Sequence, residues 1–208
     1  AGPVEFASVM GEIGRALAPE PYLDAALVPG SLIVATAEGD LREELLGCLA
    51  GGELLLAFAH QEAGDRWPAA AVATTAADGK LTGTKSLVPH GDCADKLIVS
   101  ARENGEVGLY LVDADAEGVT RTAYRTHDRR RGAQIVFDGA SATRLGSGDA
   151  SALLADVEVG IQTALCAEAV GAMERALDLT VDYLKTRKQF GVTPVSYTHL
   201  RAHETSLH

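Results

Sequence analysis

The sequence predicts an α+β fold with helices at both ends and a small β domain between them. Apolar residues recur at helical spacing in the N-terminal quarter of the chain. Short β-like runs separated by turn residues follow, and helical spacing returns after Asp149 with no proline before Lys188. We therefore expect a partial N-terminal helical domain, a middle β-barrel or sandwich domain and the start of a C-terminal helical bundle, over residues 4–52, 53–147 and 148–194.

The N-terminal helices are predicted from apolar periodicity and from helix-breaking residues. Residues 4–18 carry one apolar stripe at helical spacing, and Pro19 ends that helix. Residues 22–36 are apolar and are expected to form two short helices or one broken helix. Residues 40–50 follow as a further helix, for which Asp40 is the expected N-cap.

The middle of the chain contains seven strand-like runs. The turns at Asp78-Gly79 and Asn104-Gly105 are typical of hairpins. The runs are residues 54–60, 70–75, 80–88, 96–101, 107–112, 120–124 and 134–137. Short strands at this spacing indicate a small antiparallel barrel or sandwich.

The last long segment is predicted to be a single helix that ends near Lys188. About forty residues at 1.5 Å per residue give a length of about 60 Å, and such a helix cannot cover its own apolar residues. It needs partner helices, and the chain supplies none after it. We therefore expect a helical bundle that is cut short.

The charge balance excludes some partners. The formal net charge is -11 and the pI is about 4.9, which argues against nucleic acid or an anionic membrane as partner. The basic run Arg129–Arg131 is interpreted as a solvated turn, with a phosphate contact as the alternative. Three scattered cysteines give neither a disulfide framework nor a metal site. No signal peptide and no membrane-spanning apolar run is present, so a cytoplasmic location is expected.

The final segment, residues 195–208, differs from the rest of the chain. It reads VSYTHLRAHETSLH and holds three of the six histidines. It resembles a translated sequencing adapter joined to the reading frame, so we exclude it from the fold. The spacing of His199, His203 and His208 would allow a metal site, but none is expected here. The natural protein is expected to continue past Pro194 with other residues.

Three segments, in chain order, resemble the acyl-CoA dehydrogenase family, and the strongest is Arg175–Gly191, RALDLTVDYLKTRKQFG. In that family this segment ends the first long helix of the C-terminal bundle. The resemblance implies that Arg187 and Phe190 reach the flavin of a neighbouring subunit. Arginine offers a rigid fork of donors to a pyrophosphate, and phenylalanine offers an apolar face. The alternative is an ordinary helix end whose cations favour the helix dipole.

The second segment, residues 81–102, resembles the family's stretch L-x-G-x-K-x-W-I-T-N-G-x-x-A-D. The matches are Leu81, Gly83, Lys85, Gly91, Ala94 and Asp95. Two flavin-contacting positions depart from the pattern, because Leu87 stands where the family has tryptophan and Pro89 where it has serine or threonine. Proline has no N–H and no hydroxyl, so a hydrogen bond to the isoalloxazine ring is lost there.

The third segment, residues 54–67, stands where the family has its Thr-Glu flavin and substrate loop. Gln61-Glu62 aligns with Thr-Glu, while the Gly-Ser-Asp part of that loop is not preserved. The resemblance therefore places Ala59 and Gln61 beside the flavin, and Gln61 can donate a hydrogen bond. His60 also flanks this loop, where a histidine could polarise a flavin carbonyl, although a structural loop histidine is the alternative.

The family's reaction needs a glutamate base while the β-hydrogen leaves as hydride to the flavin. In most members the base lies beyond the segment that ends at Gly191. In a minority it lies on the long helix, at the position of Ile161, which cannot take a proton; its usual arginine neighbour falls on Gln162. Glu158 and Glu168 are expected to turn away from the 161 face by about 60° or more. No residue of the chain is therefore a predicted base.

The resemblance leaves two main readings of function. The first is a fragment of a catalytic acyl-CoA dehydrogenase subunit that binds FAD, acts on an acyl-CoA and passes electrons to an electron-transfer flavoprotein. The second is a non-catalytic subunit of a heteromeric dehydrogenase, which Leu87 and Pro89 favour. Residues 14–27 also resemble a divergent branch whose members are often encoded in pairs. Either reading implies a homo- or hetero-oligomer of like subunits, and a flavin-free binding module is a third possibility.

Overall fold

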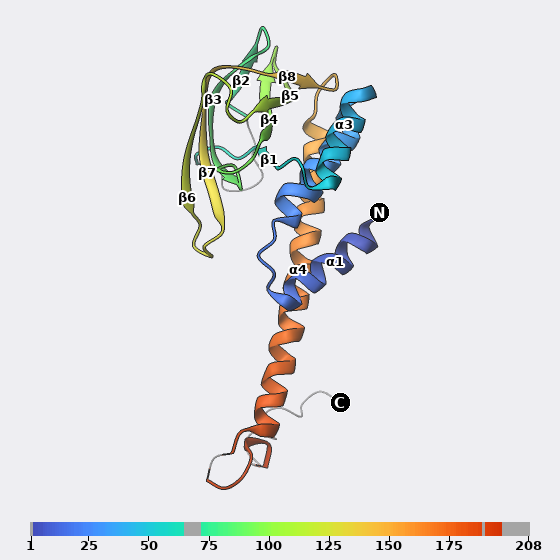
Figure 1. Ribbon diagram of the computed structural model, residues 1–208, viewed down its shortest axis with the longest axis vertical. Coiled ribbons are helices and arrows are strands. Elements are labelled where there is room, and N and C mark those ends of the chain that lie inside the picture. The colour runs from blue at the N-terminus through green and yellow to red at the C-terminus, as the bar shows by residue number, and fades with distance from the viewer. Residues whose placement is uncertain (1, 65–71, 189, 197–208) are drawn as a thin grey trace. The chain divides into compact units, whose positions relative to one another are not determined.

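The computed structural model describes most of the chain (Figure 1), namely residues 2–64, 72–188 and 190–196. It divides into two compact units, which are residues 1–18 with 163–208 and residues 19–162. Each unit is described by itself below. Parts of two predicted segments, residues 65–71 and 197–208, lie outside the described residues.

The second unit begins with three short helices, η1 (Tyr22–Leu27), α2 (Val28–Thr36) and α3 (Gly39–Gly51). The first is a single π-helical turn that runs directly into α2, so the predicted broken helix is confirmed. The prediction of Asp40 as N-cap is wrong, because the helix begins at Gly39 and Glu38 occupies the cap. Asp40 lies in the first turn instead, where a negative charge favours the helix dipole.

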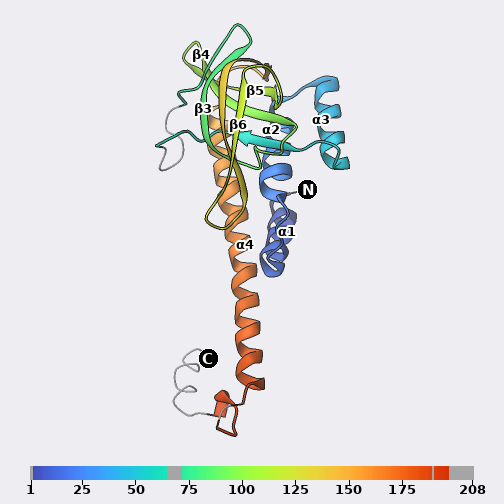
Figure 2. The ribbon, with the colours of Figure 1, turned by 60° about the vertical axis from the view of Figure 1, so that its left-hand side comes forward.

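The β domain is one eight-stranded sheet (Figure 2), and its strands are β1 (Leu56–Ala59), β2 (Thr75–Ala77), β3 (Lys80–Pro89), β4 (Lys96–Glu103), β5 (Glu106–Asp113), β6 (Val119–Arg125), β7 (Arg131–Ser141) and β8 (Thr143–Leu145). The strand order is β6-β7-β3-β2-β4-β5-β8, and β1 also pairs with β4. Most pairs are antiparallel, but β1 and β2 each run parallel to β4. Six of the seven predicted runs overlap a strand over several residues, whereas the run 70–75 meets β2 only at Thr75. The sequence predicted neither the short β8 nor the parallel pairs.

The core of the β domain is formed mainly by residues of β1, β3, β4, β5 and β7. Its largest fully buried side chains include Tyr110 and Phe137, packed with leucine, valine and isoleucine residues of these strands. Two polar side chains, Lys85 and Ser100, are as deeply buried as these, with no exposed surface. Burying a polar group costs stability unless it is hydrogen-bonded, and burying a charge costs more unless it is also paired. Both side chains are therefore expected to have hydrogen-bond partners inside the domain.

The first unit consists of α1 (Pro3–Ala16) and the part of α4 (Ser151–Thr186) that follows residue 162. The two helices cross at glycines. A Cβ added at Gly14 would lie 1.9 Å from the carbonyl oxygen of Glu168, and one added at Gly171 would lie 1.9 Å from that of Gly11. The backbones therefore touch directly, and only glycine fits at this crossing.

The predicted long helix is confirmed, since α4 has 36 residues. Within the described residues, no helix is both long and apolar enough to cross a membrane. Much of the apolar surface of α4 is exposed: Met173 is 61% and Leu177 is 64% exposed. This agrees with the expectation that the helix needs further partner helices.

Candidate functional site

The two loop segments that the sequence analysis assigned to the flavin lie side by side in the β domain. Gln61, just past the end of β1, forms an isolated antiparallel bridge with Leu87 of β3. The backbone N–H of Ser86 donates to the carbonyl oxygen of Gln61 at 2.9 Å. This bridge, which we call the Gln61–Leu87 edge, joins residues that are distant in sequence.

The exposure of these side chains decides which of them a ligand could touch. Gln61 is exposed and Leu87 is 38% exposed, so an amide and an apolar side chain face solvent together. Pro89 is half-buried and pairs with Gly132 of β7. Ala59 is fully buried, so its side chain offers no surface to a ligand, and only its backbone could make the predicted contact.

Directly behind this edge lies a buried ion pair. The Lys85 ammonium donates to Glu62 Oε1 at 2.7 Å, to the carbonyl oxygen of His60 at 3.0 Å and to Ser100 Oγ at 3.1 Å. An ammonium group has three donors, so each has an acceptor. Glu62 also accepts hydrogen bonds from the backbone N–H groups of Ala73 and Thr74, at 2.8 and 3.0 Å.

These contacts keep Glu62 ionised. Burial alone would raise the pKa of Glu62, but the hydrogen bonds from Lys85, Thr74 and Ala73 outweigh it and lower this pKa from 4.5 to about 2. The ion pair between Lys85 and Glu62 therefore fixes the loop that contains Gln61 against the sheet. Glu62, which the sequence left open between a loop carboxylate and a functional one, has the contacts of a structural residue.

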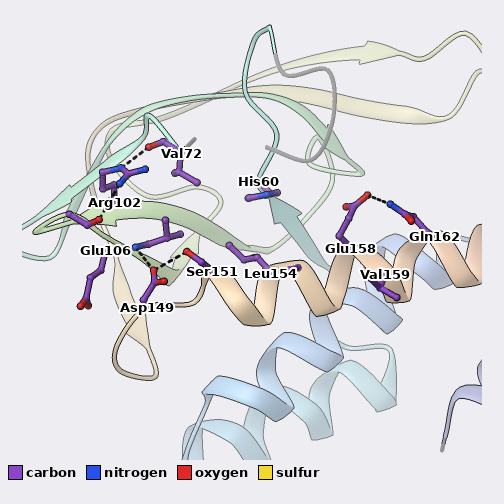
Figure 3. A pocket seen from close by; sticks show the side chains of 13 residues that line it. His60, Val72, Arg102, Glu106, Asp149, Ser151, Leu154, Glu158, Val159 and Gln162 are labelled. Atoms are coloured by element: carbon purple, nitrogen blue, oxygen red, sulfur yellow. Dashed lines mark hydrogen bonds between the residues drawn. The ribbon is translucent and has the colours of Figure 1, made fainter. Parts of the chain in front are cut away.

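A pocket of about 830 Å³ opens beside His60 (Figure 3), within the second unit. One wall is formed by β4, the β4–β5 turn and β5, and the other by the first turns of α4. The lining residues are His60, Val72, Arg102, Gly105, Glu106, Val107, Asp149, Ser151, Leu154, Ala155, Glu158, Val159 and Gln162. The lining thus combines apolar side chains with polar and charged ones.

Most polar groups of this pocket have partners in the protein. Arg102 donates to the carbonyl oxygens of Val72 and Gly105, at 3.2 and 3.1 Å (Figure 3). Asp149 accepts from the backbone N–H of Val107 at 2.9 Å and from Ser151 Oγ at 3.0 Å. These two hydrogen bonds lower the pKa of Asp149, so this carboxylate stays charged at the start of α4.

The face of α4 that lines the pocket differs from the expected one. Ile161 does not line it, whereas Glu158 and Gln162 do, and Gln162 Nε2 donates to Glu158 Oε1 at 3.2 Å. Glu158 thus lies on a different face from Ile161, as expected, and this face is the one that lines the pocket. The reason is helical geometry, because Ser151, Leu154, Glu158 and Gln162 follow each other at three- and four-residue steps on one face.

Arg187 and Phe190 belong to the other compact unit. The Arg187 guanidinium lies over the Tyr183 ring at 5.0 Å, a cation–π contact. Phe190 is 96% exposed. The Phe190 side chain is therefore accessible to another surface, and its contact with the flavin of a neighbouring subunit stays a prediction.

Comparison with known proteins agrees with the fold and with the predicted resemblance. A family model described as acyl-CoA dehydrogenase, C-terminal domain, matches residues 162–207. The acyl-CoA dehydrogenase FadE27 of Mycobacterium tuberculosis is 28% identical over 192 residues, which cover 91% of this chain and 50% of that protein. The chain belongs to the acyl-CoA dehydrogenase family. It spans about half the length of the relatives that it matches.

Two solved structures extend the comparison. One, described as a Tcur3481-Tcur3483 steroid ACAD G363A variant, is 30% identical with a TM-score of 0.80, over 97% of this chain and 55% of that one. The other, an FAD complex of PigA, is 21% identical with a TM-score of 0.82, over 97% of this chain and 58% of that one, and supports the fold alone. This acyl-CoA dehydrogenase chain therefore has the fold of the N-terminal half of its relatives.

The family match also bears on the C-terminal segment. It extends to residue 207 and so includes residues 195–207, which the sequence analysis excluded as adapter-derived. Residues 197–208 lie outside the described part of the structure. The origin of this segment stays a prediction.

Sequence reasoning missed the residues of the pocket wall, chiefly Arg102, Asp149 and Glu158. Arg102 closes a segment that resembles the family, and Asp149 stands just before a long helix, as an N-terminal carboxylate often does. These local signals exist in the sequence. That the three residues surround one pocket follows only from the pairing of β4 with β5 and the position of α4 beside them.

Proposed function

We propose that this chain is part of an FAD-dependent acyl-CoA dehydrogenase subunit, which in its full-length form oxidises an acyl-CoA thioester between the α and β carbons. The observation that carries the proposal is the edge formed by Gln61 and Leu87, which lies beside His60 of the pocket in a chain with the family's fold. Members of the family use FAD, which supplies a hydride acceptor when it is bound.

The residues at the Gln61–Leu87 edge fit a flavin ring, except that one hydrogen-bond donor of the family pattern is missing. Gln61 offers a side-chain donor and Leu87 an apolar surface, both exposed at the same edge. Pro89 offers no donor there, so the ring has one hydrogen bond fewer than the family pattern supplies. Arg187 and Phe190 would serve the flavin of a neighbouring subunit, through a charged fork of donors and an apolar ring respectively.

We infer that the 208-residue chain alone does not catalyse this reaction. Neither Ile161 nor Gln162 has an ionisable group, and we assign no base role to Glu158, which accepts a hydrogen bond from Gln162 and lies on a different face from Ile161. The base would therefore lie in the half of the protein that the chain does not span. The natural electron acceptor in this proposal is an electron-transfer flavoprotein, and the active form is an oligomer of like subunits.

A second candidate function is a non-catalytic subunit of a heteromeric acyl-CoA dehydrogenase. Leu87 and Pro89 favour it, because both replace residues that contact the flavin in the family pattern. The description of the steroid ACAD structure names two proteins together, which is consistent with a paired assembly of this kind. In this reading the chain supports a partner subunit that holds the flavin and the base.

A flavin titration tests the proposal. FAD is added to the chain and to the double variant Leu87→Trp/Pro89→Thr, and binding is followed by flavin absorbance and fluorescence. We expect weak binding by the chain and binding at least tenfold tighter by the double variant, because one hydrogen bond and one aromatic contact together contribute about 1.4 kcal/mol or more. Val34→Trp, which adds tryptophan at an exposed site on α2, is the control and should bind like the parent.

Two results would decide between the candidates. Equal FAD affinity for the parent chain and the double variant would contradict a flavin at this edge. If the full-length natural protein reduces its flavin with acyl-CoA, it is the catalytic subunit. If it purifies without flavin and gains activity only with a second subunit, the non-catalytic function is correct.

A further inference from the structure

The hairpin of β6 and β7 ends in a cluster of arginines at residues 125–131, which we call the basic tip. This short stretch holds four arginines and one aspartate, in a chain whose formal net charge is -11. All four arginine residues are exposed, namely Arg125, Arg129, Arg130 and Arg131. Figure 1 shows the hairpin reaching beyond the ends of the neighbouring strands. The basic tip therefore lies on the surface of its unit, where another molecule can reach it.

Two features of the basic tip are locally unfavourable. Arg125 and Arg131 are direct cross-strand partners in the pairing of β6 with β7, and like charges at directly opposite positions destabilise a sheet. Arg129 has a φ of 67°, in the left-handed region that glycine and asparagine adopt more readily than arginine. Arginine thus stands where other residues would fold better, and local conflicts of this kind are typical of functional sites.

The fold neutralises only part of the charge at the basic tip. Two of the guanidinium groups have carboxylate partners, which are Asp92 at 2.8 Å and Asp128 at 3.2 Å. The Arg125 guanidinium donates to the carbonyl oxygen of Arg129 at 3.3 Å, a contact that orients the side chain but leaves its charge. Among the residues that the structure describes, neither Arg125 nor Arg129 has a carboxylate partner. Their positive charges are available to an anionic ligand.

The backbone of the basic tip disfavours a phosphate as this ligand, because phosphate sites commonly use free backbone N–H groups. The N–H of Thr126 donates to the carbonyl oxygen of Arg130 at 3.1 Å, and the N–H of Arg129 donates to that of Thr126 at 2.8 Å. The N–H of Arg130 donates to Asp128 Oδ1 at 3.2 Å. These donors are used to hold the turn. The arginines come from β6, from β7 and from the loop between them, so each can meet a separate carboxylate.

We propose that the basic tip is a docking site for a carboxylate-rich surface of another protein chain. Arginine binds a carboxylate through two parallel N–H···O bonds, which gives direction as well as attraction. Because the chain as a whole is acidic, an acidic partner is repelled by much of its surface and attracted at the tip, which determines where it docks. This inference does not rest on the proposed function, since it uses neither the flavin edge nor the pocket.

Nitrogen-15 NMR with a defined acidic probe tests the docking site. The probe is an acetylated oligoglutamate peptide, and an oligoglutamine peptide of the same length is the uncharged control. We expect the glutamate peptide to shift the Nε–H signals of Arg125 and Arg129, and the glutamine peptide to shift neither. The affinity should fall as the salt concentration is raised from about 0.05 M to about 0.5 M, because interactions between exposed charges are screened.

Arg129→Gly separates a docking role from a structural one, because it removes a guanidinium group and also relieves the positive φ. The affinity for the glutamate peptide should fall about two- to fivefold, as for the loss of one exposed ion pair. The urea concentration at half-unfolding should stay the same or rise. Arg125→Thr removes the like-charge contact between β6 and β7 and should behave in the same way. The control is Arg42→Gln, at an exposed arginine of α3, which should leave the peptide affinity unchanged.

Four results would overturn the proposal. The first is no shift of the Arg125 and Arg129 signals with the glutamate peptide, or an equal shift with the glutamine peptide. The second is lower stability of Arg125→Thr and Arg129→Gly with unchanged peptide affinity, because these arginines would then be structural. The third is an equal loss of affinity in Arg42→Gln, which would show general attraction. The fourth is tighter binding of inorganic pyrophosphate than of the glutamate peptide at the same signals, which would make the tip a phosphate site.

Discussion

Replacing Lys85 with methionine tests the central electrostatic feature of the β domain. Methionine has a similar length but no charge, so the change removes the three hydrogen bonds of the ammonium group and leaves Glu62 with its Thr74 and Ala73 donors. Removing one partner of a buried ion pair typically costs about 3–5 kcal/mol. The Glu62 side chain is only 11% exposed, so solvent screening is weak and we expect a loss within this range near neutral pH.

The pH dependence of this loss is a sharper test than its size. The pKa of Glu62 falls from 4.5 to about 2 on folding, so its contribution is fully present above pH 4.5 and is lost as the pH falls toward 2. The difference between these two pKa values corresponds to about 3 kcal/mol of folding stability. In Lys85→Met the folded pKa of Glu62 rises, because burial is no longer opposed by the ammonium group. The stability difference between the two proteins should therefore shrink below pH 4.5.

The assay is urea unfolding at pH 6 and pH 2.5, followed at the amide resonances of residues 96–103 in β4. This signal reports on the β domain and not on the other compact unit. Lys80→Met, at an exposed lysine of the same strand, is the matched control and should change the free energy of unfolding by less than about 0.5 kcal/mol. An equally large Lys85→Met effect at both pH values would refute the reasoning.

Two further perturbations test packing in each unit. Gly171→Ala should detach α1 from α4 and raise amide exchange throughout α1, because the new Cβ would lie 1.9 Å from a backbone oxygen. Continued protection of the α1 amides in this variant would contradict the crossing geometry. The control is Gly160→Ala, whose new Cβ would have nothing within 4 Å and which should stabilise its helix by about 0.5–1 kcal/mol. Burial, with a hydrogen bond to Glu103, raises the pKa of Tyr110 to about 12, and the nearby positive charge of Arg144 opposes this. Arg144→Met should therefore cost about 1 kcal/mol and raise the pKa of Tyr110 further, measured by ultraviolet pH titration, and a lower pKa would contradict the assignment.

The sequence predicted much of the local structure because its signals are local. Apolar spacing without proline gave α4, and turn pairs such as Asp78-Gly79 marked the hairpin between β2 and β3. The cap of α3 shows the limit of such signals. Asp40 and Glu38 are both acceptable near a helix start, and the backbone conformation decides between them.

The pairing of strands could not be predicted from local patterns. β1 and β2 run parallel to β4, although hairpin-like turns suggested an antiparallel sheet throughout. Parallel pairs join segments that are distant in sequence, so no short turn between the two strands indicates the pairing. The antiparallel bridge between Gln61 and Leu87 also joins residues that are distant in sequence, so the candidate flavin edge emerges only after the sheet is assembled.

The sequence by itself therefore determined the helices, most of the strands and the resemblance to acyl-CoA dehydrogenases, since each depends on residues within one short segment. Tertiary structure decided that Lys85 is a buried partner of Glu62 and that Ser100 connects it to His60. In the sequence these residues lie on three different segments, and nothing local indicates that they meet. Their role arises because burial leaves each polar group dependent on the others for its hydrogen bonds.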